Sequence, residues 1–254
     1  DSNVDFPEPE TPTMAIDSDG SARKLILSRT LKGPSGVVYS LEILSTMMAA
    51  VRACVSIVSL CLITLVSPPA LAESNVILIV GDSLSAGYGI GLDRAWPALL
   101  QQRLAEHGYP YRVENASISG ETTQGGLTRL ATLLERHEPR LVIVELGAND
   151  GLRGIAIPEA ERNLRRMLAM MRDHGTDTLL FEMRIPPNYG PVYAAQFEGM
   201  YDRLAELDDV RLVPFFLDGV VLNRSLMQND GLHPNADAQP LILNNVWDYI
   251  EDEL

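Results

Sequence analysis

Short β-rich runs alternate with helical stretches along the chain from residue 75 onward. The β-rich runs cover 76–80, 111–115, 141–145, 178–182 and 210–213, and the helical stretches cover 95–107, 124–137, 158–174, 191–207 and 235–251. Such an alternating series predicts βαβ units that feed a parallel sheet. We therefore expect an α/β fold with a five-stranded parallel sheet between two helical layers, in one domain over 73–254.

The first 72 residues read as two segments that precede this domain. Residues 1–46 mix Pro, Ser, Gly and scattered charges without periodicity, which predicts an unfolded leader or an artificially added segment. Residues 47–72 have the layout of a signal peptide: a cation at Arg52, an apolar stretch over 55–66, and small residues before an expected cleavage after Ala72. The alternative, an uncleaved membrane anchor, needs about 20 apolar residues, which is more than the stretch over 55–66 provides. We expect a periplasmic or secreted protein with no stable membrane anchor after cleavage.

Composition excludes several classes of chemistry. The chain has 20 Lys and Arg against 34 Asp and Glu, a formal net charge of −14, which argues against nucleic acid or an anionic membrane surface as a partner. Both cysteines, Cys54 and Cys61, and both lysines, Lys24 and Lys32, precede residue 73. The expected mature chain therefore has no disulfide, no thiol nucleophile and no lysine base. The sequence leaves the oligomeric state open.

Polar and small residues follow the first three predicted strands. Ser83 follows the first, in Gly-Asp-Ser-Leu; Gly120 follows the second; and Asn149 follows the third. Ligands of such sheets bind beyond the carboxyl ends of the strands, where the strand order reverses. With the common order 2-1-3-4-5, these three segments are neighbours, and we expect the functional site there.

A serine nucleophile needs a base, and the chain offers four histidines. His107, His137 and His174 each lie at a predicted helix end, where an imidazole interacts favourably with the helix dipole. Only His233 has no such explanation, and Asp230 precedes it by three residues in a turn, a spacing that lets the carboxylate reach Nδ1. The alternative is that Asp230 only shapes the turn before the last helix.

Acyl transfer also needs hydrogen-bond donors for the oxyanion. The candidates are the Ser83 amide, the Gly120 amide and the Asn149 side chain. For Asn149, a role as a turn former is the competing interpretation. Other hydrolase and nucleotide-binding signatures are incomplete: Ser85 stands where a GxSxG motif needs glycine, Leu92 stands where GxGxxG needs its last glycine, and no HExxH is present.

In order along the chain, GDSL at 81–84, Gly120, GAND at 147–150 and DGLH at 230–233 resemble the four blocks of the SGNH or GDSL hydrolases. Further stretches, among them NASISGETTQGGL and MQNDGLHPNADAQP, are similar to the bacterial exported thioesterase I, lysophospholipase and arylesterase group of that family. The resemblance covers residues 75–249. It implies a flavodoxin-like α/β/α sandwich without cofactor or metal.

The resemblance also implies roles for individual residues. Ser83 attacks the acyl carbonyl, His233 is general base and then general acid, Asp230 orients it, and Ser83, Gly120 and Asn149 hold the oxyanion. The family further implies a substrate pocket lined by Arg153, Ile155, Pro187, Asn188 and Tyr189, although Arg153 also fits a solvated loop cation. The implied substrates are small acyl and aryl esters, acyl thioesters and lysophospholipids. Two alternatives stay open: a carbohydrate O-acetylesterase, and a catalytically silent member that binds lipid or glycan.

Overall fold

The computed structural model describes residues 31–32, 38–39, 75–207 and 210–254, and the chain divides into two units at residues 1–71 and 72–254. In the first unit, strand β1 (Leu31–Lys32) pairs antiparallel with strand β2 (Val38–Tyr39). The predicted signal peptide and the remainder of the predicted leader lie outside the described residues.

The second unit contains one parallel five-stranded sheet. Its strands are β3 (Val76–Gly81), β4 (Arg112–Asn115), β5 (Leu141–Glu145), β6 (Asp177–Phe181) and β7 (Arg211–Val213). They pair in the order β4-β3-β5-β6-β7, which confirms the predicted order 2-1-3-4-5. The order reverses at β3, which pairs with β4 on one side and β5 on the other, so that Ile79 lies beside both Asn115 and Ile143.

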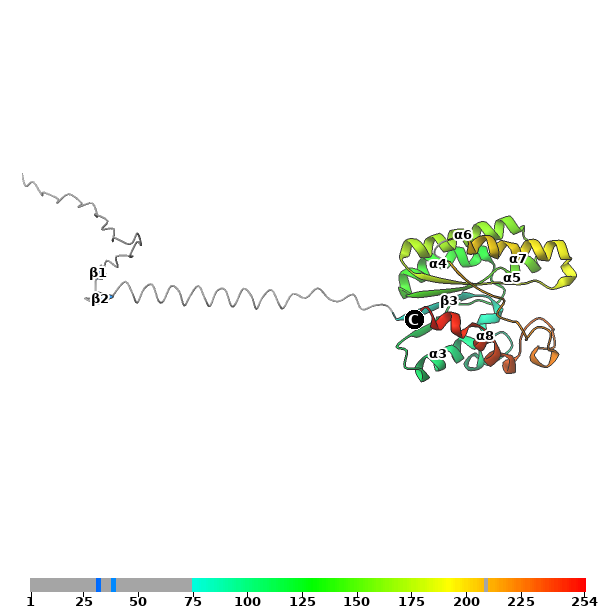
Figure 1. Cartoon of the computed structure of the whole chain (residues 1–254), viewed down its shortest axis with the longest axis horizontal. Coiled ribbons are helices and arrows are strands. Elements are labelled where there is room, and N and C mark those ends of the chain that lie inside the picture. The colour runs from blue at the N-terminus through cyan, green and yellow to red at the C-terminus, as the bar shows by residue number, and fades with distance from the viewer. Residues whose placement is uncertain (1–30, 33–37, 40–74, 208–209) are drawn as a thin grey trace, which may run out of the picture. The chain divides into compact units, whose positions relative to one another are not determined.

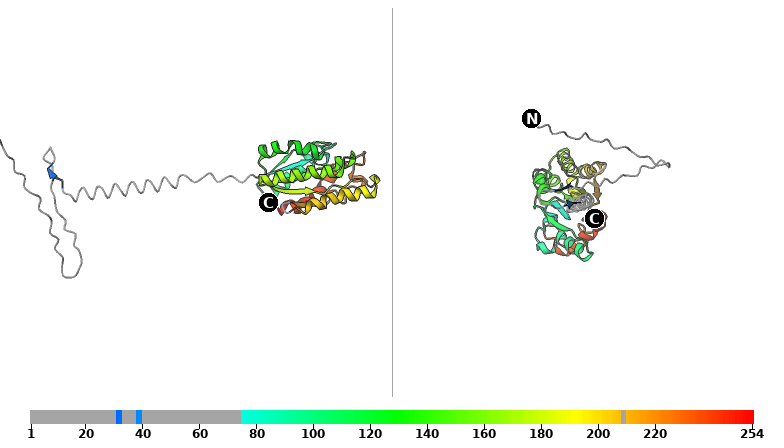
Figure 2. Two further views of the ribbon diagram at one scale, coloured as in Figure 1. Left: turned by 90° about the horizontal axis from the view of Figure 1, so that it is seen from above. Right: turned by 90° about the vertical axis from the view of Figure 1, so that its left-hand side faces the viewer.

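Helices cover both faces of the sheet, which confirms the three-layer α/β/α arrangement (Figure 1). One layer holds α4 (Thr123–His137), α5 (Ala148–Leu152), α6 (Ile157–His174) and α7 (Pro191–Ala205), and the other holds α3 (Trp96–Glu106) and α8 (Gln239–Glu251). Figure 2 shows the long helices running alongside the strands. Short 3-10 helices lie at Leu92–Arg94, Pro187–Tyr189, Arg224–Leu226 and Ala236–Ala238.

Burial follows the sequence pattern of each strand. The central strands β3 and β5 are buried at every position, as expected for continuous apolar runs covered by helices on both faces. The edge strand β4 has exposed residues at Arg112 and Asn115. Trp96 of α3 is fully buried and stacks on Phe181 of β6, with ring centroids 5.8 Å apart. This core fixes the carboxyl ends of the strands relative to one another.

The structure differs from the expected elements in two respects. The predicted final helix over 235–251 is a 3-10 turn followed by α8, because the Asn235 side chain caps the turn and Pro240 stands in the first turn of α8. Two short helices were not predicted, α2 (Ser83–Ala86) and α5, because four or five residues are too few to show a helical period. Among the described residues, no helix is both long and apolar enough to span a bilayer.

Candidate active site

Ser83 lies at the sharp turn between β3 and α2. Strand β3 ends at Gly81, and Asp82 caps the helix by accepting a hydrogen bond from the Leu84 N–H at 3.0 Å. Ser83 is the first residue of α2, so its side chain emerges directly beyond the carboxyl end of the central strand. Asp82 is therefore the N-cap of α2.

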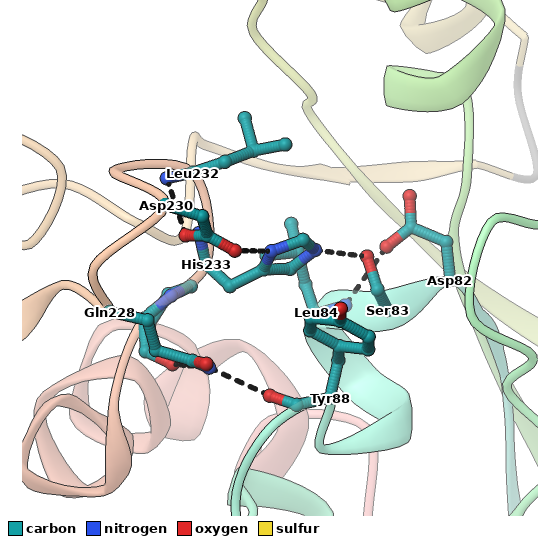
Figure 3. A network of polar contacts seen from close by, with 9 residues as sticks. Asp82, Ser83, Leu84, Tyr88, Gln228, Asp230, Leu232 and His233 are labelled. Carbon is teal, nitrogen blue, oxygen red and sulfur yellow. Dashed lines mark hydrogen bonds and ion pairs between the residues drawn. The ribbon is translucent and has the colours of Figure 1, made fainter.

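The structure brings Ser83, His233 and Asp230 together across 150 residues of sequence (Figure 3). The His233 Nε2 atom lies 3.0 Å from Ser83 Oγ, and His233 Nδ1 lies 2.7 Å from Asp230 Oδ2. Both contacts have the length of hydrogen bonds. Because an imidazole that donates from Nδ1 to a carboxylate keeps Nε2 free as an acceptor, the Ser83 hydroxyl can donate to it.

Asp230 also binds the backbone of its own turn. Its Oδ1 accepts hydrogen bonds from the Leu232 N–H at 2.9 Å and the His233 N–H at 3.0 Å. The bond from the His233 N–H, then the bond from the His233 ring and then the bond from the Leu232 N–H, lower the pKa of Asp230 to about 2. Asp230 is therefore a carboxylate at every pH at which such a site works. The interpretation of Asp230 as a turn-shaping residue is also correct, since one oxygen shapes the turn and the other contacts the ring.

The loop that carries His233 is fastened to the loop that follows α2. The Gln228 side chain donates to the Tyr88 carbonyl at 2.7 Å and to the Pro234 carbonyl at 3.0 Å. The Tyr88 ring packs against the His233 ring, with centroids 4.5 Å apart. Neither Gln228 nor Tyr88 was predicted to contribute, because nothing in a sequence pairs residues 140 positions apart. Together they restrain the imidazole over Ser83.

The other three histidines end helices, as predicted. His137 and His174 are the last residues of α4 and α6, and His107 follows the last residue of α3. The His174 Nδ1 atom lies 2.8 Å from Thr176 Oγ1.

Ser83 and His233 open into a cavity of about 760 Å³. Loops from the carboxyl ends of all five strands contribute to its wall, as expected for an open α/β sheet. The loops after the first three strands contribute Ser83, Gly120 and Asn149. The loops after β6 and β7 supply an apolar part that includes Met183, Ile185, Phe215, Leu217, Val221 and Leu222. The cavity thus joins a polar end to an apolar part.

The three candidate oxyanion donors lie at the polar end. Gly120 has φ +80°, a backbone conformation that favours glycine, and it lines the cavity. Asn149 lies in α5, and its side-chain NH2 donates to Asp82 Oδ2 at 2.9 Å. An amide NH2 carries two hydrogens, so one remains for a ligand. The Asn149 side chain thus bonds to Asp82 in the segment after β3.

Four of the residues that the family resemblance implied for substrate binding are not among the residues that line the cavity: Arg153, Ile155, Asn188 and Tyr189. Arg153 is exposed and donates from Nη2 to the Gly120 carbonyl at 2.8 Å. Tyr189 donates to the Leu152 carbonyl at 3.0 Å. Pro187 begins the 3-10 helix that holds Asn188 and Tyr189. The role of these residues in substrate binding stays a prediction.

Two buried carboxyl groups, those of Asp82 and Glu145, lie at the carboxyl ends of β3 and β5, next to the segment that carries Ser83. Asp82 and Glu145, the last residue of β5, are 1% and 0% exposed. Glu145 Oε2 accepts hydrogen bonds from the Asp82 N–H at 3.1 Å and from Ser85 Oγ at 2.7 Å. Burial raises the pKa of Asp82 to about 6. Burial, and then the charge of Asp82, raises the pKa of Glu145 well above its usual value. Sequence reasoning missed Glu145, although an acid that ends a fully apolar strand is a visible signal.

Gly147 lies between β5 and the helix that carries Asn149, and its replacement by alanine is expected to destabilise the fold. Its φ is +125°, and a Cβ there would overlap the hydroxyl of Tyr201, which is fully buried and donates to the Leu146 carbonyl. We expect Gly147→Ala to lower the free energy of unfolding by about 2 to 4 kcal/mol, through backbone strain and overpacking. Urea denaturation measures this loss.

Gly154→Ala is the matched control for that prediction. Gly154 also has a positive φ, +69°, but nothing lies within 4 Å of its Cβ position. The control therefore isolates the left-handed backbone cost of about 1 kcal/mol. Equal losses for the two variants would contradict the assigned contact with Tyr201.

The chain is similar to proteins of a known family. Residues 79–240 match the model of the GDSL-like lipase/acylhydrolase family. An arylesterase of Vibrio mimicus is 47% identical over 169 residues, which cover 66% of this chain and 84% of that protein. The thioesterase 1/protease 1/lysophospholipase L1 of Escherichia coli K12 is 48% identical over 171 residues, which cover 67% and 81%.

A solved structure supports the same assignment. The crystal structure of TesA is 49% identical in sequence and superimposes with a TM-score of 0.69, covering 70% of this chain and 99% of that chain. The family model accounts for more than half of the chain, and its blocks contain the residues gathered around the cavity. The chain therefore belongs to the GDSL-like lipase/acylhydrolase family.

Proposed function

We propose that this protein is a serine esterase that hydrolyses fatty-acyl and aryl esters, acyl thioesters and lysophospholipids. The observation that carries the proposal is the continuous set of contacts from Asp230 through His233 to Ser83, at the mouth of a cavity with a large apolar part. The family match and the names of the similar proteins support this class of reaction.

In the proposed reaction, Ser83 Oγ attacks the acyl carbonyl while its proton passes to His233 Nε2. Asp230 keeps the imidazole in the productive tautomer and stabilises the imidazolium. His233 then returns the proton to the leaving alcohol, phenol or thiol. A water molecule deprotonated by His233 attacks the acyl-enzyme, and the bond from the acyl carbon to Ser83 Oγ breaks as His233 gives the proton back to Ser83. In both steps, the Ser83 N–H, the Gly120 N–H and the Asn149 side chain receive the negative charge that develops on the carbonyl oxygen.

The apolar part of the cavity favours acyl chains of medium length over acetyl groups. Phe215, Leu217 and Met183 offer an acyl chain a surface without hydrogen-bond demands, and burying each methylene contributes about 0.8 kcal/mol. We infer that substrate preference is set by how much of the acyl chain enters the part of the cavity that is lined by the loops after β6 and β7.

A series of p-nitrophenyl esters from acetate to dodecanoate tests the proposal. We expect kcat/KM to rise at least about tenfold from the acetyl to the octanoyl ester, because six more methylenes enter the apolar part. Leu217→Asp, which places a charge in that part, should abolish the increase and leave the acetyl ester turned over. Turnover of acetylated sugars with little activity on octanoyl and longer esters would support the carbohydrate O-acetylesterase, and no turnover of any ester would support the silent binding protein.

We also propose that the protein is exported to the periplasm or the medium after cleavage following Ala72. The proposal rests on the layout of residues 47–72. Expression of the full sequence in a bacterial host, fractionation of the cells and N-terminal sequencing of the product test it. A product that begins at Glu73 in the periplasmic or culture fraction is the expected result.

A further inference from the structure

The buried carboxyl of Glu145 takes no direct part in the proposed reaction, yet it contacts the segment that carries Ser83. Glu145 is fully buried at the end of β5, and its Oε1 has no hydrogen-bond partner among the described residues. An ionised carboxylate is strongly unfavourable in a fully buried position unless both of its oxygens are hydrogen-bonded. A carboxyl group in these surroundings is expected to hold a proton.

The hydrogen bonds identify which oxygen carries that proton. An indole N–H is only a donor, so Ser85 Oγ accepts from Trp96 Nε1 at 3.2 Å. The Ser85 hydroxyl donates its own proton to Glu145 Oε2, 2.7 Å away, which also accepts from the Asp82 N–H. Oε2 acts as a carbonyl oxygen, and the hydroxyl is at Oε1.

Asp82 is the anion of the pair. Its Oδ1 accepts from the Leu84 N–H and its Oδ2 from the Asn149 NH2, so both oxygens face N–H donors. The other titratable groups that face the two carboxyls are His233, which favours the ionised form of Asp82, and the buried phenol of Tyr201. The two carboxyl groups thus share one negative charge, and it resides on the member that contacts Asn149.

We propose that Glu145 is a positioning residue for the oxyanion hole: as a neutral carboxylic acid, it holds the Asp82 backbone and leaves the Asp82 carboxylate to fix the Asn149 amide. The inference rests on the proposed function, in which the second hydrogen of the Asn149 NH2 receives the oxyanion. Glu145 acts on the reaction only through Asp82 and Asn149.

A double-mutant cycle with Asn149 tests the route of this effect. We expect Asn149→Ala to lower kcat on p-nitrophenyl octanoate by about 10²-fold or more, the cost of one oxyanion donor. Glu145→Ala should lower kcat by about 10- to 100-fold with KM changed less than about threefold. The double variant should be no slower than Asn149→Ala within about threefold, because both changes remove the same interaction. Losses that multiply would overturn the proposal.

Two further variants separate positioning from a general loss of packing. Glu145→Gln keeps a carbonyl oxygen for the Asp82 N–H and Ser85 Oγ and places an NH2 where the hydroxyl stood, so kcat should return to within about fivefold of the wild type. A Gln variant as slow as the Ala variant would overturn the proposal.

Thr176→Val is the control for the loss of a buried hydrogen bond far from the site. Thr176 is buried and donates to the Pro139 carbonyl, and it directly precedes β6 at the amino end of the sheet. It should lower stability and leave kcat unchanged.

The protonation state of Glu145 can be measured without activity. Infrared spectra of folded wild type at pH 7 should contain the carbonyl band of a protonated carboxylic acid that is missing from Glu145→Gln.

The same proton predicts that stability depends on pH. The folded state keeps a proton on Glu145 that the unfolded state loses above about pH 4.5. The free energy of unfolding of the wild type should therefore fall relative to that of Glu145→Gln as pH rises from 5 to 8. Identical spectra and parallel pH profiles would overturn the neutral acid. Neither measurement needs turnover. A protein that shows the infrared band and the pH effect but hydrolyses no ester would therefore refute the proposed function, while the neutral state of Glu145 would stand.

Discussion

Ser83→Ala is expected to lower kcat/KM for p-nitrophenyl octanoate by about 10⁴-fold or more, the usual cost of removing the nucleophile from a triad. Ser83 is the residue whose oxygen lies both within hydrogen-bond distance of His233 and on the wall of the cavity. Its replacement by Ala deletes one oxygen atom and leaves the backbone turn and the Ser83 N–H in place. KM should change little, because the apolar part of the cavity still binds the acyl chain.

The control for this prediction is Ser225→Ala. Ser225 is an exposed serine in the 3-10 helix Arg224–Leu226. Among the described residues, its hydroxyl forms a hydrogen bond only with Asn223. Its loss should leave kcat/KM within about twofold. A fluorophosphonate probe gives a second measurement, since it should label the wild type and Ser225→Ala covalently and fail to label Ser83→Ala. A Ser83→Ala protein that retains more than about a tenth of wild-type activity would place the nucleophile elsewhere.

The fold was predictable because its periodic signals are long and mutually consistent. The runs at 76–80 and 141–145 are apolar at nearly every position, which is typical of central strands covered on both faces, and both became the middle of the sheet. The separations between strands leave room for crossover helices, so the parallel order followed. Helices α2 and α5 escaped prediction because each is set by a cap and a turn and not by a repeating apolar face.

The candidate site was predictable only where chemistry limits the choice of residues. Three of the four histidines had helix-end explanations, which left His233 and, by its spacing, Asp230. The apolar half of the cavity offered no comparable signal, because Met183 and Phe215 look like ordinary core residues in a sequence. Polar and small residues marked the loops after the first three strands, and the loops after β6 and β7 also line the cavity, as expected for ligands that bind beyond the strand ends.

Contacts between distant loops were the part that the sequence could not provide. Gln228 reaches the Tyr88 carbonyl, and Glu145 reaches the Asp82 N–H, across 140 and 63 residues. Each depends on which strands are neighbours and on the twist that brings their ends together. Such contacts determine how rigidly the reacting groups are held, so the precision of this site is a property of the tertiary structure.

Asp230→Asn is expected to lower kcat by about 10⁴-fold, although it changes neither size nor shape. Oδ1 would remain to accept the Leu232 and His233 N–H groups, so the turn would keep its form and the NH2 would replace Oδ2 beside the imidazole. That NH2 can only donate, so His233 Nδ1 must become the acceptor and Nε2 must carry the hydrogen. A protonated Nε2 cannot take the Ser83 proton.

The matched control is Asp237→Asn, which removes a carboxylate from an exposed ion pair with Arg94 and should leave kcat within about twofold. The tautomer can be observed directly: ¹⁵N shifts of the His233 ring in wild type at high pH should place the hydrogen on Nδ1, and in Asp230→Asn on Nε2. An Asp230→Asn enzyme within tenfold of wild-type kcat, with the hydrogen still on Nδ1, would mean that the carboxylate shapes the turn without orienting the base. Because the pKa of Asp230 is about 2, its protonation should have no part in any loss of activity between pH 4 and pH 7.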